Sequence, residues 1–560
     1  MFSVRTLRFL LRTSFAIAGL ALFYFLGGLL FNINNDMLVW GVQVLFFGVL
    51  FGFLGICVLK KEVSFGKDFW QVFGILLLNH VFGLAIIVLA LDHPALFDRF
   101  SFRLPPFQFV FFLFMSLAAF YLAFAISRKF GLPGWIEKPR LFLLSHLSGT
   151  VLAGIFFVIY FVLAILFNRT EFYMIDSLFE GDHSYWLTFF GVDGLGIDPR
   201  IRAVHPLVYL FLRPLSWLAT LLVGGNPYYG TLLLIAAMGA LAVFLFWLFL
   251  YEHGLSKPFA LLLASLFGAT TTQLLFGSFA ESYIFSAAAL LLFFVLLQRK
   301  TTTLQSLIPA GLLVFGITIS NVVQTITALF FVRKNIKLVM RYVFILVFVA
   351  MLLTLVNNAL YPYESGYFFI PEQLLGEKKY TQSVLDFPEW KLRGRIYSTA
   401  RNLLFYSVVA PSSFFAVPDP GKSLPRISFF DFSFYAGSYA HSAYDGIGDF
   451  LLLTWLFLVF IAGLFFLWSL RKRENWQNTS TLFSLALLAN IAFNLVFHII
   501  YGEDPFLYSA DWTYALILFV GINLVERWWS KAYLLVFIAM LMINNYFFLD
   551  KLIAVLAQAV

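Results

Sequence analysis

Cysteine and charged residues are scarce in this chain of 560 residues. Its single cysteine, Cys57, excludes a disulfide within the chain. Only 12% of the residues are charged, whereas soluble domains have roughly 25%. Hydrophobic residues make up 61% of the chain, and the mean hydropathy is +0.90. This composition excludes an ordinary soluble domain and indicates a protein that crosses a membrane many times.

Several motifs of other protein classes are also missing. The sequence has no P-loop, no His-Glu-x-x-His pair and no Cys-x-x-Cys pair. It has no internal repeat or inverted pair of halves, which are common in transporters. The net charge of +8 comes mainly from Lys and Arg that flank apolar runs, where they orient helices against the cytoplasmic leaflet. We therefore expect no nucleic-acid partner, and the sequence has no soluble nucleotide-binding domain.

Long apolar runs occupy most of the chain and predict an all-α polytopic membrane protein. Counting runs near the length that spans a bilayer gives about 15 transmembrane helices. The first run follows a basic start and lacks a clear cleavage site, so we expect it to be retained. The run at 305–332 is too long for one span and has a polar centre, "TISNVVQT". It is predicted to form two shortened helices that meet near the outer surface.

Basic residues give the chain an orientation. Short segments rich in Lys and Arg lie at 5–12, 60–67, 128–140, 298–300, 332–337 and 471–476. The positive-inside rule places them all on the cytoplasmic side. The number of crossings between these segments agrees with this placement if residues 205–222 lie along the outer surface and do not cross. This segment includes two prolines and an Arg, which make it a poor spanning helix. The segments predicted outside are then 168–227, 277–282, 361–446 and 501–512.

A linker with Gly, Pro and basic residues, "SRKFGLPGWIEKPR" at 127–140, predicts a domain boundary. We expect an N-terminal four-helix membrane unit over residues 1–130 and a membrane core over residues 141–560. The core carries two long outer loops, 168–227 and 361–446. No role follows from the residues of the N-terminal unit.

Four motifs follow the apolar helix at 142–167. They are "FNRTEFYMIDSLFEGDHSYW", "HPLVYLFLRPL" from His205, "FAESYIFSAAALLLFFVL" and "HIIYGEDPFLYSADW". In this order they resemble the GT-C superfamily of integral-membrane glycosyltransferases, which includes protein O-mannosyltransferases and aminoarabinose transferases. The resemblance covers about residues 142–550, and the order of the motifs is more specific than any one of them.

The resemblance implies an enzyme that transfers a hexosyl or pentosyl group from a polyprenyl-phosphate carrier, with inversion at the anomeric carbon. The implied acceptor is a lipid, a glycan or a protein at the outer face of a membrane, and a bacterial inner membrane is the expected location. An acceptor hydroxyl that attacks the sugar needs a carboxylate as general base. The leaving phosphate needs Arg, Lys or a metal ion. No cofactor follows with certainty, and a divalent cation, Mg²⁺ or Mn²⁺, stays open.

Three acids are the predicted catalytic residues. Asp182 in "GDHSY" best matches the loop acid of the family and is expected to be the general base. Asp176 is the rival, and its alternative role is to cap a short helix. Glu281 lies in a very short loop between two apolar runs and is expected to support the base. The alternative for Glu281 is an interfacial acid in the headgroup region.

Ten side chains are predicted to bind substrate. They are His183, His205, Lys391, Arg393, Arg395, Arg401, His498, Glu503, Asp504 and Tyr508. The segment 391–401, "KLRGRIYSTAR", holds four cations and no acid, which suits a clamp for the donor phosphate. Its alternative role is to bind anionic lipid headgroups. For the histidines the alternatives are a solvated loop residue and a simple surface-helix residue.

Two other functions compete with the enzyme. A transporter or flippase of a lipid-linked glycan would carry polar residues through its spans, and this sequence has few in mid-span. A scaffold subunit would account for the unassigned N-terminal helices but would leave the acids of the outer loops without a purpose.

Overall fold

The computed structural model describes most of the chain. The described residues are 20, 23–33, 36–60, 68–98, 103–129, 142, 145–172, 174–299, 303–362, 364, 366–381, 388–431 and 440–560. The predicted basic segment at 5–12 and most of the linker at 127–140 lie outside them.

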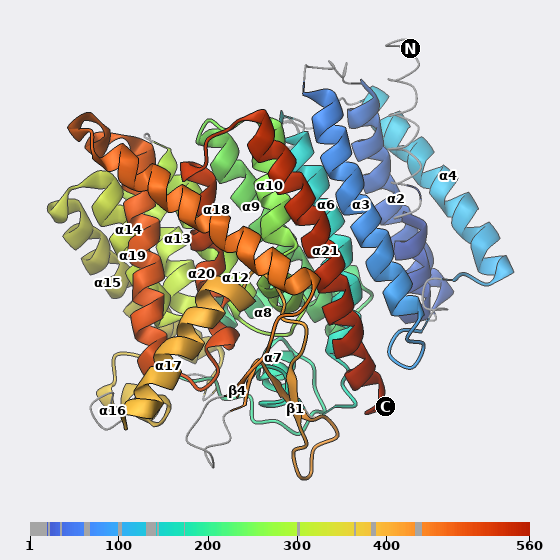
Figure 1. Ribbon diagram of the computed structural model, residues 1–560. Coiled ribbons are helices and arrows are strands. Elements are labelled where there is room, and N and C mark those ends of the chain that lie inside the picture. Colours follow the sequence, from blue (N-terminus) through green and yellow to red (C-terminus); the bar gives the residue numbers. More distant parts are fainter. Residues whose placement is uncertain are drawn as a thin grey trace.

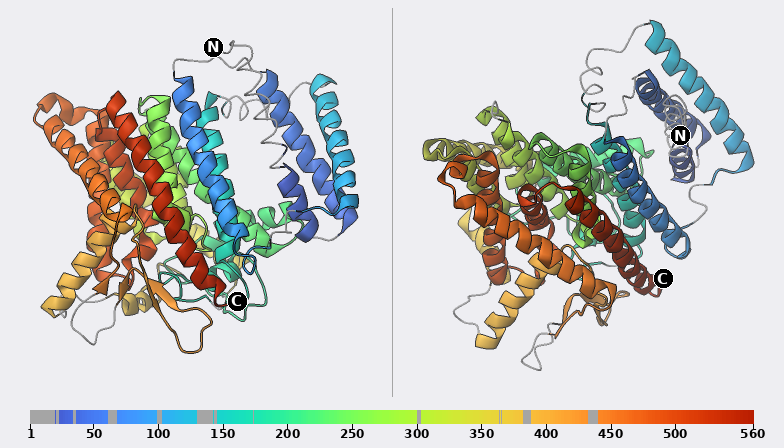
Figure 2. Two further views of the ribbon diagram at one scale, coloured as in Figure 1. Left: turned by 45° about the vertical axis from the view of Figure 1, so that its right-hand side comes forward. Right: turned by 45° about the horizontal axis from the view of Figure 1, so that its top comes forward.

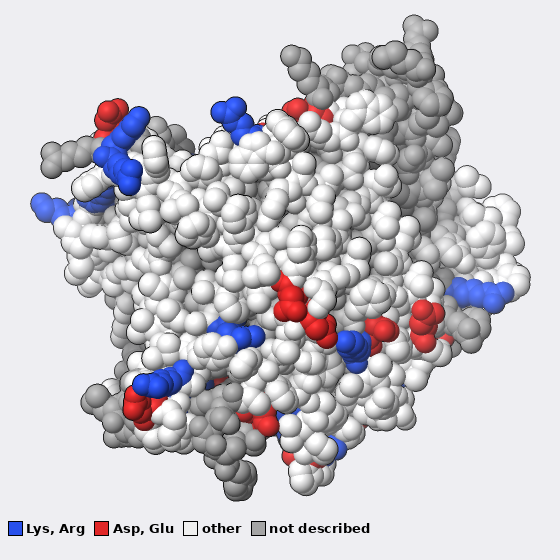
Figure 3. All heavy atoms as spheres, in the orientation of Figure 1, with Lys and Arg blue, Asp and Glu red and all other residues white. Residues whose placement is uncertain are grey.

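Apolar helices make up the body of the protein, which confirms the prediction of an all-α polytopic membrane protein (Figure 1). Eight described helices are long and apolar enough to cross a membrane. They are α3 (Phe69–Leu91), α4 (Pro106–Lys129), α6 (Leu147–Phe167), α9 (Pro227–Glu252), α15 (Ile336–Leu360), α18 (Ile447–Leu470), α19 (Thr479–Ile500) and α21 (Trp528–Ala557). On the face shown in Figure 3, charged side chains lie toward the two ends of the bundle, and a broad uncharged band lies between them.

Other apolar helices are shorter or are described only in part. They are Phe23–Ile33, α2 (Met37–Lys60), α8 (Val208–Leu222), α10 (Lys257–Gly268), α12 (Tyr283–Gln298), α13 (Leu304–Ile317), α14 (Val322–Arg333) and α20 (Ala510–Asn523). Several have fewer than the roughly 20 residues that a straight span needs. The number of crossings therefore stays a prediction.

The long run at 305–332 is interrupted, as its polar centre predicted. Helix α13 ends at Ile317, a 3₁₀ turn covers Ile319–Asn321, and α14 follows. The interruption leaves backbone groups without helical partners, and the loop at 168–227 satisfies one of them, because the N–H of Ile319 donates to the carbonyl of Val204 at 3.1 Å. The two shortened helices therefore meet beside this loop, and its position on the outer side stays a prediction.

The N-terminal helices pack in two different ways (Figure 2). Helices α2 and α4 pair closely, because Gly48 and Gly52 face Ala119 and Ala123, and small residues four apart let two helix backbones approach. Helix α3 packs instead against α6, α10 and α21 of the core. The boundary near residue 130 stays a prediction.

The segments between the long helices gather at one end of the bundle (Figure 1). They form α7 (His183–Phe189), α11 (Thr271–Phe276), α16 (Pro371–Leu375), α17 (Glu389–Arg401), β1 (Phe415–Val417), β2 (Arg426–Ser428), β3 (Phe430–Asp431), β4 (Ala440–His441) and the 3₁₀ turn η7 (Pro505–Tyr508). Strands β1 and β2 form one antiparallel pair, and β3 and β4 form another. We call this end the loop end.

Candidate functional site

The loop at 174–182 carries the predicted acids in an unusual backbone shape. Asp176, Phe179 and Glu180 have φ angles of 55°, 53° and 62°, which side chains other than glycine rarely adopt. Strand β2 holds this shape through its residue Ile427. The N–H of Phe179 donates to the Ile427 carbonyl at 2.8 Å, and the N–H of Ile427 donates to the Ser177 carbonyl at 2.7 Å. The strained loop is therefore stabilised by contacts from far along the chain.

Two cations of the β1–β2 hairpin also hold the loop. Arg426 forms an ion pair with Glu180, and it reaches Glu503 at 3.4 Å. Lys422 donates to the carbonyl of Ile175 at 2.7 Å. The hairpin thus contributes both backbone and charged contacts to one face of the acid loop.

The loop and the turn at 277–282 meet at Asp182 and Glu281. The backbone N–H of Asp182 donates a hydrogen bond to Oε1 of Glu281. Asn168, at the end of α6, fixes the turn: its Nδ2 donates to the Ser278 carbonyl and its Oδ1 accepts from the Ala280 N–H, both at 2.7 Å. Glu281 is buried, whereas the Asp182 side chain is partly exposed. The geometry gives one buried acid and one partly exposed acid.

Burial raises the pKa of both acids. It raises the pKa of Asp182 to about 6, and the charge of Asp176 adds to this rise. Burial, with the charge of Asp182, raises the pKa of Glu281 well above its usual value. At neutral pH most of Asp182 is ionised, whereas burial favours the protonated form of Glu281. Among the described residues the Asp182 carboxylate has no hydrogen-bond partner, so it is free to accept a proton from another molecule.

Arg202 is a cation of this site that we did not predict. Its charge lowers the pKa of both Asp182 and Glu281. It lies 3.5 Å from Glu377 and stacks over the ring of Tyr380 at 4.6 Å, with 36% of its side chain exposed. The available signal was its place in "DPRIRAVHP", three residues before the His-Pro-Leu motif.

Aromatic rings pack against one another beside the acids. The ring of Tyr508 stacks on His498 at 4.2 Å and meets Tyr283 edge-on at 5.4 Å. Tyr501 lies 5.9 Å from Tyr508 and donates its hydroxyl to Glu377 at 3.0 Å. The structure therefore brings predicted residues His498 and Tyr508 together with Tyr283, a residue of the quoted Glu-Ser-Tyr motif to which we had given no role.

The other two predicted histidines are buried and neutral. Burial lowers the pKa of His183 to about 3, and its ring packs edge-on against Phe279 at 4.6 Å. Burial also lowers the pKa of His205 to about 3, and Nδ1 of His205 lies 2.5 Å from the carbonyl of Ile317. His205 thereby joins the loop at 168–227 to the interruption between α13 and α14.

The cations of 391–401 have protein partners and lie on α17. Arg395 uses four of its five N–H groups to bind the carbonyls of His498, Ile499, Gly502 and Glu503 at 2.6 to 3.3 Å. This arrangement satisfies the C-terminal carbonyls of α19. It gives the buried Arg395 a structural role and leaves little of its guanidinium for a phosphate.

The remaining cations of α17 have different surroundings. Arg401 donates to the hydroxyls of Tyr397 and Tyr406 at 2.6 and 3.0 Å. Arg393 is exposed and pairs with Glu389 one turn away. Lys391 is half-buried and has a partner of its own.

The two acids at 503–504 differ from each other. Asp504 is buried and accepts hydrogen bonds from the Ser428 hydroxyl at 2.6 Å and from the Phe506 N–H at 2.8 Å. It caps the 3₁₀ turn η7 and joins it to β2. Glu503 is exposed and lies at the rim, near Arg426.

The acid pair does not fit a divalent cation. Mg²⁺ requires several charged or carbonyl oxygens in near-octahedral geometry. Here burial disfavours the charged form of Glu281, and its Oε1 already accepts the N–H of Asp182. Within the described part of the chain no three His, Cys, Asp or Glu side chains lie together in a way that could hold a metal ion. We therefore assign no chemical step to a metal.

Comparison with known proteins gives no match: no family model, no curated protein and no solved structure is significantly similar to this chain. The resemblance to the GT-C superfamily therefore stays a prediction from the sequence motifs.

Proposed function

We propose that this protein is a membrane glycosyltransferase that moves a sugar from a polyprenyl-phosphate carrier to an acceptor at the loop end of the bundle. One observation carries the proposal. Asp182, whose carboxylate has no hydrogen-bond partner among the described residues, is fixed through its backbone by the buried Glu281. A partly exposed carboxylate with a raised pKa, held in place by a second acid, suits proton transfer coupled to bond exchange.

In the proposed step the Asp182 carboxylate takes the proton of the acceptor hydroxyl. The acceptor oxygen attacks the anomeric carbon, and the bond from that carbon to the phosphate oxygen breaks. The electron pair of that bond leaves with the polyprenyl phosphate, and the configuration at the anomeric carbon inverts. Glu281 positions the base and does not exchange a proton with the substrate.

Arg202 is the proposed cation for the leaving phosphate. Its charge acts on Asp182 and Glu281, so it lies within electrostatic range of the reacting groups. Its guanidinium is partly exposed, and an Arg can bind a phosphate in a bidentate manner. This assignment replaces Arg395, which is occupied by backbone carbonyls, as the main phosphate contact. The rings of Tyr283 and Tyr508 are suited to pack against the sugar.

A transfer assay tests the proposal. Purified protein in lipid is given radiolabelled polyprenyl-phosphate sugars and membrane extract, and the label in new products is measured. We expect transfer by the wild type, none by Asp182→Asn, and near-normal transfer by Asp176→Asn, because Asp176 is exposed. Intact transfer by Asp182→Asn would show that this acid is not the base.

A flippase of a lipid-linked glycan is the second candidate, and one feature of the helix core favours it. A chain of hydrogen bonds between polar side chains runs through α14, α19, α20 and α12. It joins Thr327, Asn490, Tyr514, Gln324, Asn321 and Ser286. Polar groups within spans often mark transport paths. Movement of a fluorescent lipid-linked glycan between leaflets, without consumption of the donor in the transfer assay, would establish this function instead.

A further inference from the structure

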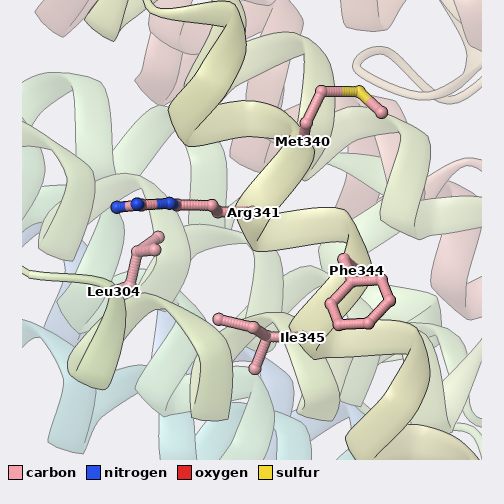
Figure 4. Close-up of a pocket in the computed structure, with 5 residues that line it drawn as sticks. All are labelled: Leu304, Met340, Arg341, Phe344 and Ile345. Carbon is pink, nitrogen blue, oxygen red and sulfur yellow. The ribbon is translucent and has the colours of Figure 1, made fainter.

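A second site candidate lies at the opposite end of the bundle from Asp182 and Glu281. A shallow groove of about 550 Å³ runs between the first residue of α13 and the first turns of α15. Leu304 forms one side, and Met340, Arg341, Phe344 and Ile345 form the other (Figure 4). Four of these five side chains are apolar, and the fifth is a cation.

Two cations point outward from the same face of α15. Lys337 and Arg341 are one turn apart, so their side chains are neighbours on the helix surface, and both are exposed. Among the described residues neither has an ion-pair or hydrogen-bond partner. In Figure 4 the guanidinium of Arg341 extends across the groove and lies next to Leu304.

The local electrostatics leave this pair of positive charges uncompensated. A helix N-terminus carries a partial positive charge, which disfavours cations and favours anions. Arg341 lies in the second turn of α15, and the first turn contains no acid. The pair is therefore open to an anion from outside the chain.

The groove continues into an apolar stripe of the same helix. Met340, Phe344 and Phe348 are 62%, 73% and 54% exposed, and the rings of Phe344 and Phe348 stack. Helix α15 has 25 residues and is about 37 Å long, which exceeds the roughly 30 Å hydrocarbon core. The first turns of α15 therefore reach headgroup depth, and the stripe beyond them faces acyl chains.

We propose that this groove is a binding site for an anionic phospholipid. The phosphodiester lies against Arg341 and Lys337, and one acyl chain follows Ile345, Phe344 and Phe348. Charge complementarity selects an anionic headgroup over a zwitterionic one, and the apolar stripe selects a lipid over a soluble phosphate. The proposal is independent of the function proposed for the loop end.

Native mass spectrometry of the purified full chain tests this site. Protein equilibrated with equimolar phosphatidylglycerol and phosphatidylcholine of matched acyl chains should retain phosphatidylglycerol preferentially. Removing one cation, in Arg341→Ala or Lys337→Ala, should lower its retention about fivefold, because a basic residue near an anionic surface contributes about 1 kcal/mol. Arg341→Lys should keep most of the preference, and it controls for misfolding.

A matched variant and a competitor separate the alternatives. Lys472 is another exposed cation and precedes the 3₁₀ turn Arg473–Gln477, where the Trp476 carbonyl accepts a hydrogen bond from Lys334. Lys472→Ala should leave lipid retention unchanged. Inorganic phosphate should not displace the lipid. Equal retention of both lipids, or unchanged retention in Arg341→Ala, would mean that the cations only orient the helix. Displacement by phosphate would mean a soluble-anion site and would overturn the lipid assignment.

Discussion

The backbone N–H of Asp182 donates to the carboxylate of Glu281, a residue 99 positions further along the chain. This contact fixes the backbone of the proposed base and leaves its side chain free. In the proposed mechanism Asp182 supplies the charge of the base, and Glu281 supplies the acceptor for its backbone N–H. Substitution can remove the charge of Asp182 and the acceptor oxygen of Glu281 separately.

Glu281→Gln should retain most of the activity, because glutamine keeps a side-chain oxygen that can accept the Asp182 N–H. Glu281→Ala removes that acceptor. A buried donor without a partner costs about 1–3 kcal/mol, so we expect kcat to fall about 5- to 150-fold. Steady-state transfer kinetics at neutral pH measure both variants. Equal loss in the two would mean that the reaction needs an ionisable group at position 281.

The pH profile of transfer should report Asp182. Burial raises its pKa to about 6, so the carboxylate is neutral below that pH and ionised above it. A general base works only when ionised, so kcat/KM should rise with pH through about 6 and then level off.

Removal of the Arg202 charge should move this profile to higher pH, because that charge lowers the pKa of Asp182. Arg202→Gln is the test variant. The control is Arg393→Gln, which removes a charge from an exposed pair on α17 and should leave the profile in place. A profile that moves to lower pH in Arg202→Gln contradicts this electrostatic assignment.

The sequence predicted the helical class and the interruption at 305–332 because composition and polarity act locally. Asp182 could be selected because it matches the loop acid of the resembled family, and Glu281 because it lies in a very short loop between two apolar runs. Their direct contact could not be predicted, because it depends on how Asn168 anchors the turn after α11 and on how β2 holds the loop. Pairings between distant segments leave no periodic pattern in a single sequence.

For the cations at 391–401 the sequence suggested a binding site, whereas the structure gives one of them, Arg395, a structural role. Four Lys and Arg without an acid suggest an anion site, but backbone carbonyls are acceptors that a sequence does not display. Arg395 is surrounded by four of them. Arg202 was missed because the groups that it acts on come from other segments of the chain, among them Glu377 and Tyr508, and the residues around it in the sequence do not show them.

Arg426→Ala should lower kcat and leave the melting temperature almost unchanged. The side chain holds Glu180 in a loop whose residues adopt positive φ angles, and a looser loop would misplace Asp182. A partly exposed ion pair stabilises a fold by about 0–1 kcal/mol, so the melting temperature should change little. Arg426→Lys should restore part of the rate. The outcome that contradicts this role is a loss of stability with a normal kcat in the folded fraction.

Arg395→Ala should destabilise the protein strongly. Four carbonyls near the end of α19 would lose a charged donor, and hydrogen bonds to charged groups contribute about 1.5–3 kcal/mol each without adding fully. We expect a loss of about 3 kcal/mol or more, measured as a lower melting temperature in detergent. The KM for the donor should stay unchanged in the protein that remains folded. A raised KM at normal stability would restore Arg395 as a phosphate contact.

Gly181→Ala should disrupt the junction of the two acids without a change of charge. A Cβ at this position would lie 2.6 Å from Cε1 of His183, 3.0 Å from the Leu178 carbonyl and 3.1 Å from Oε1 of Glu281. His183 is buried against Phe279 and cannot move aside freely, so the added methyl group should displace Glu281 and lengthen its bond to the Asp182 N–H. We expect kcat to fall at least about tenfold, since small misplacements of a catalytic group have large effects. Gly154→Ala is the control, because a Cβ there meets nothing within 4 Å and alanine favours a helix. Normal kcat in Gly181→Ala would show that the contact between Asp182 and Glu281 is not needed for transfer.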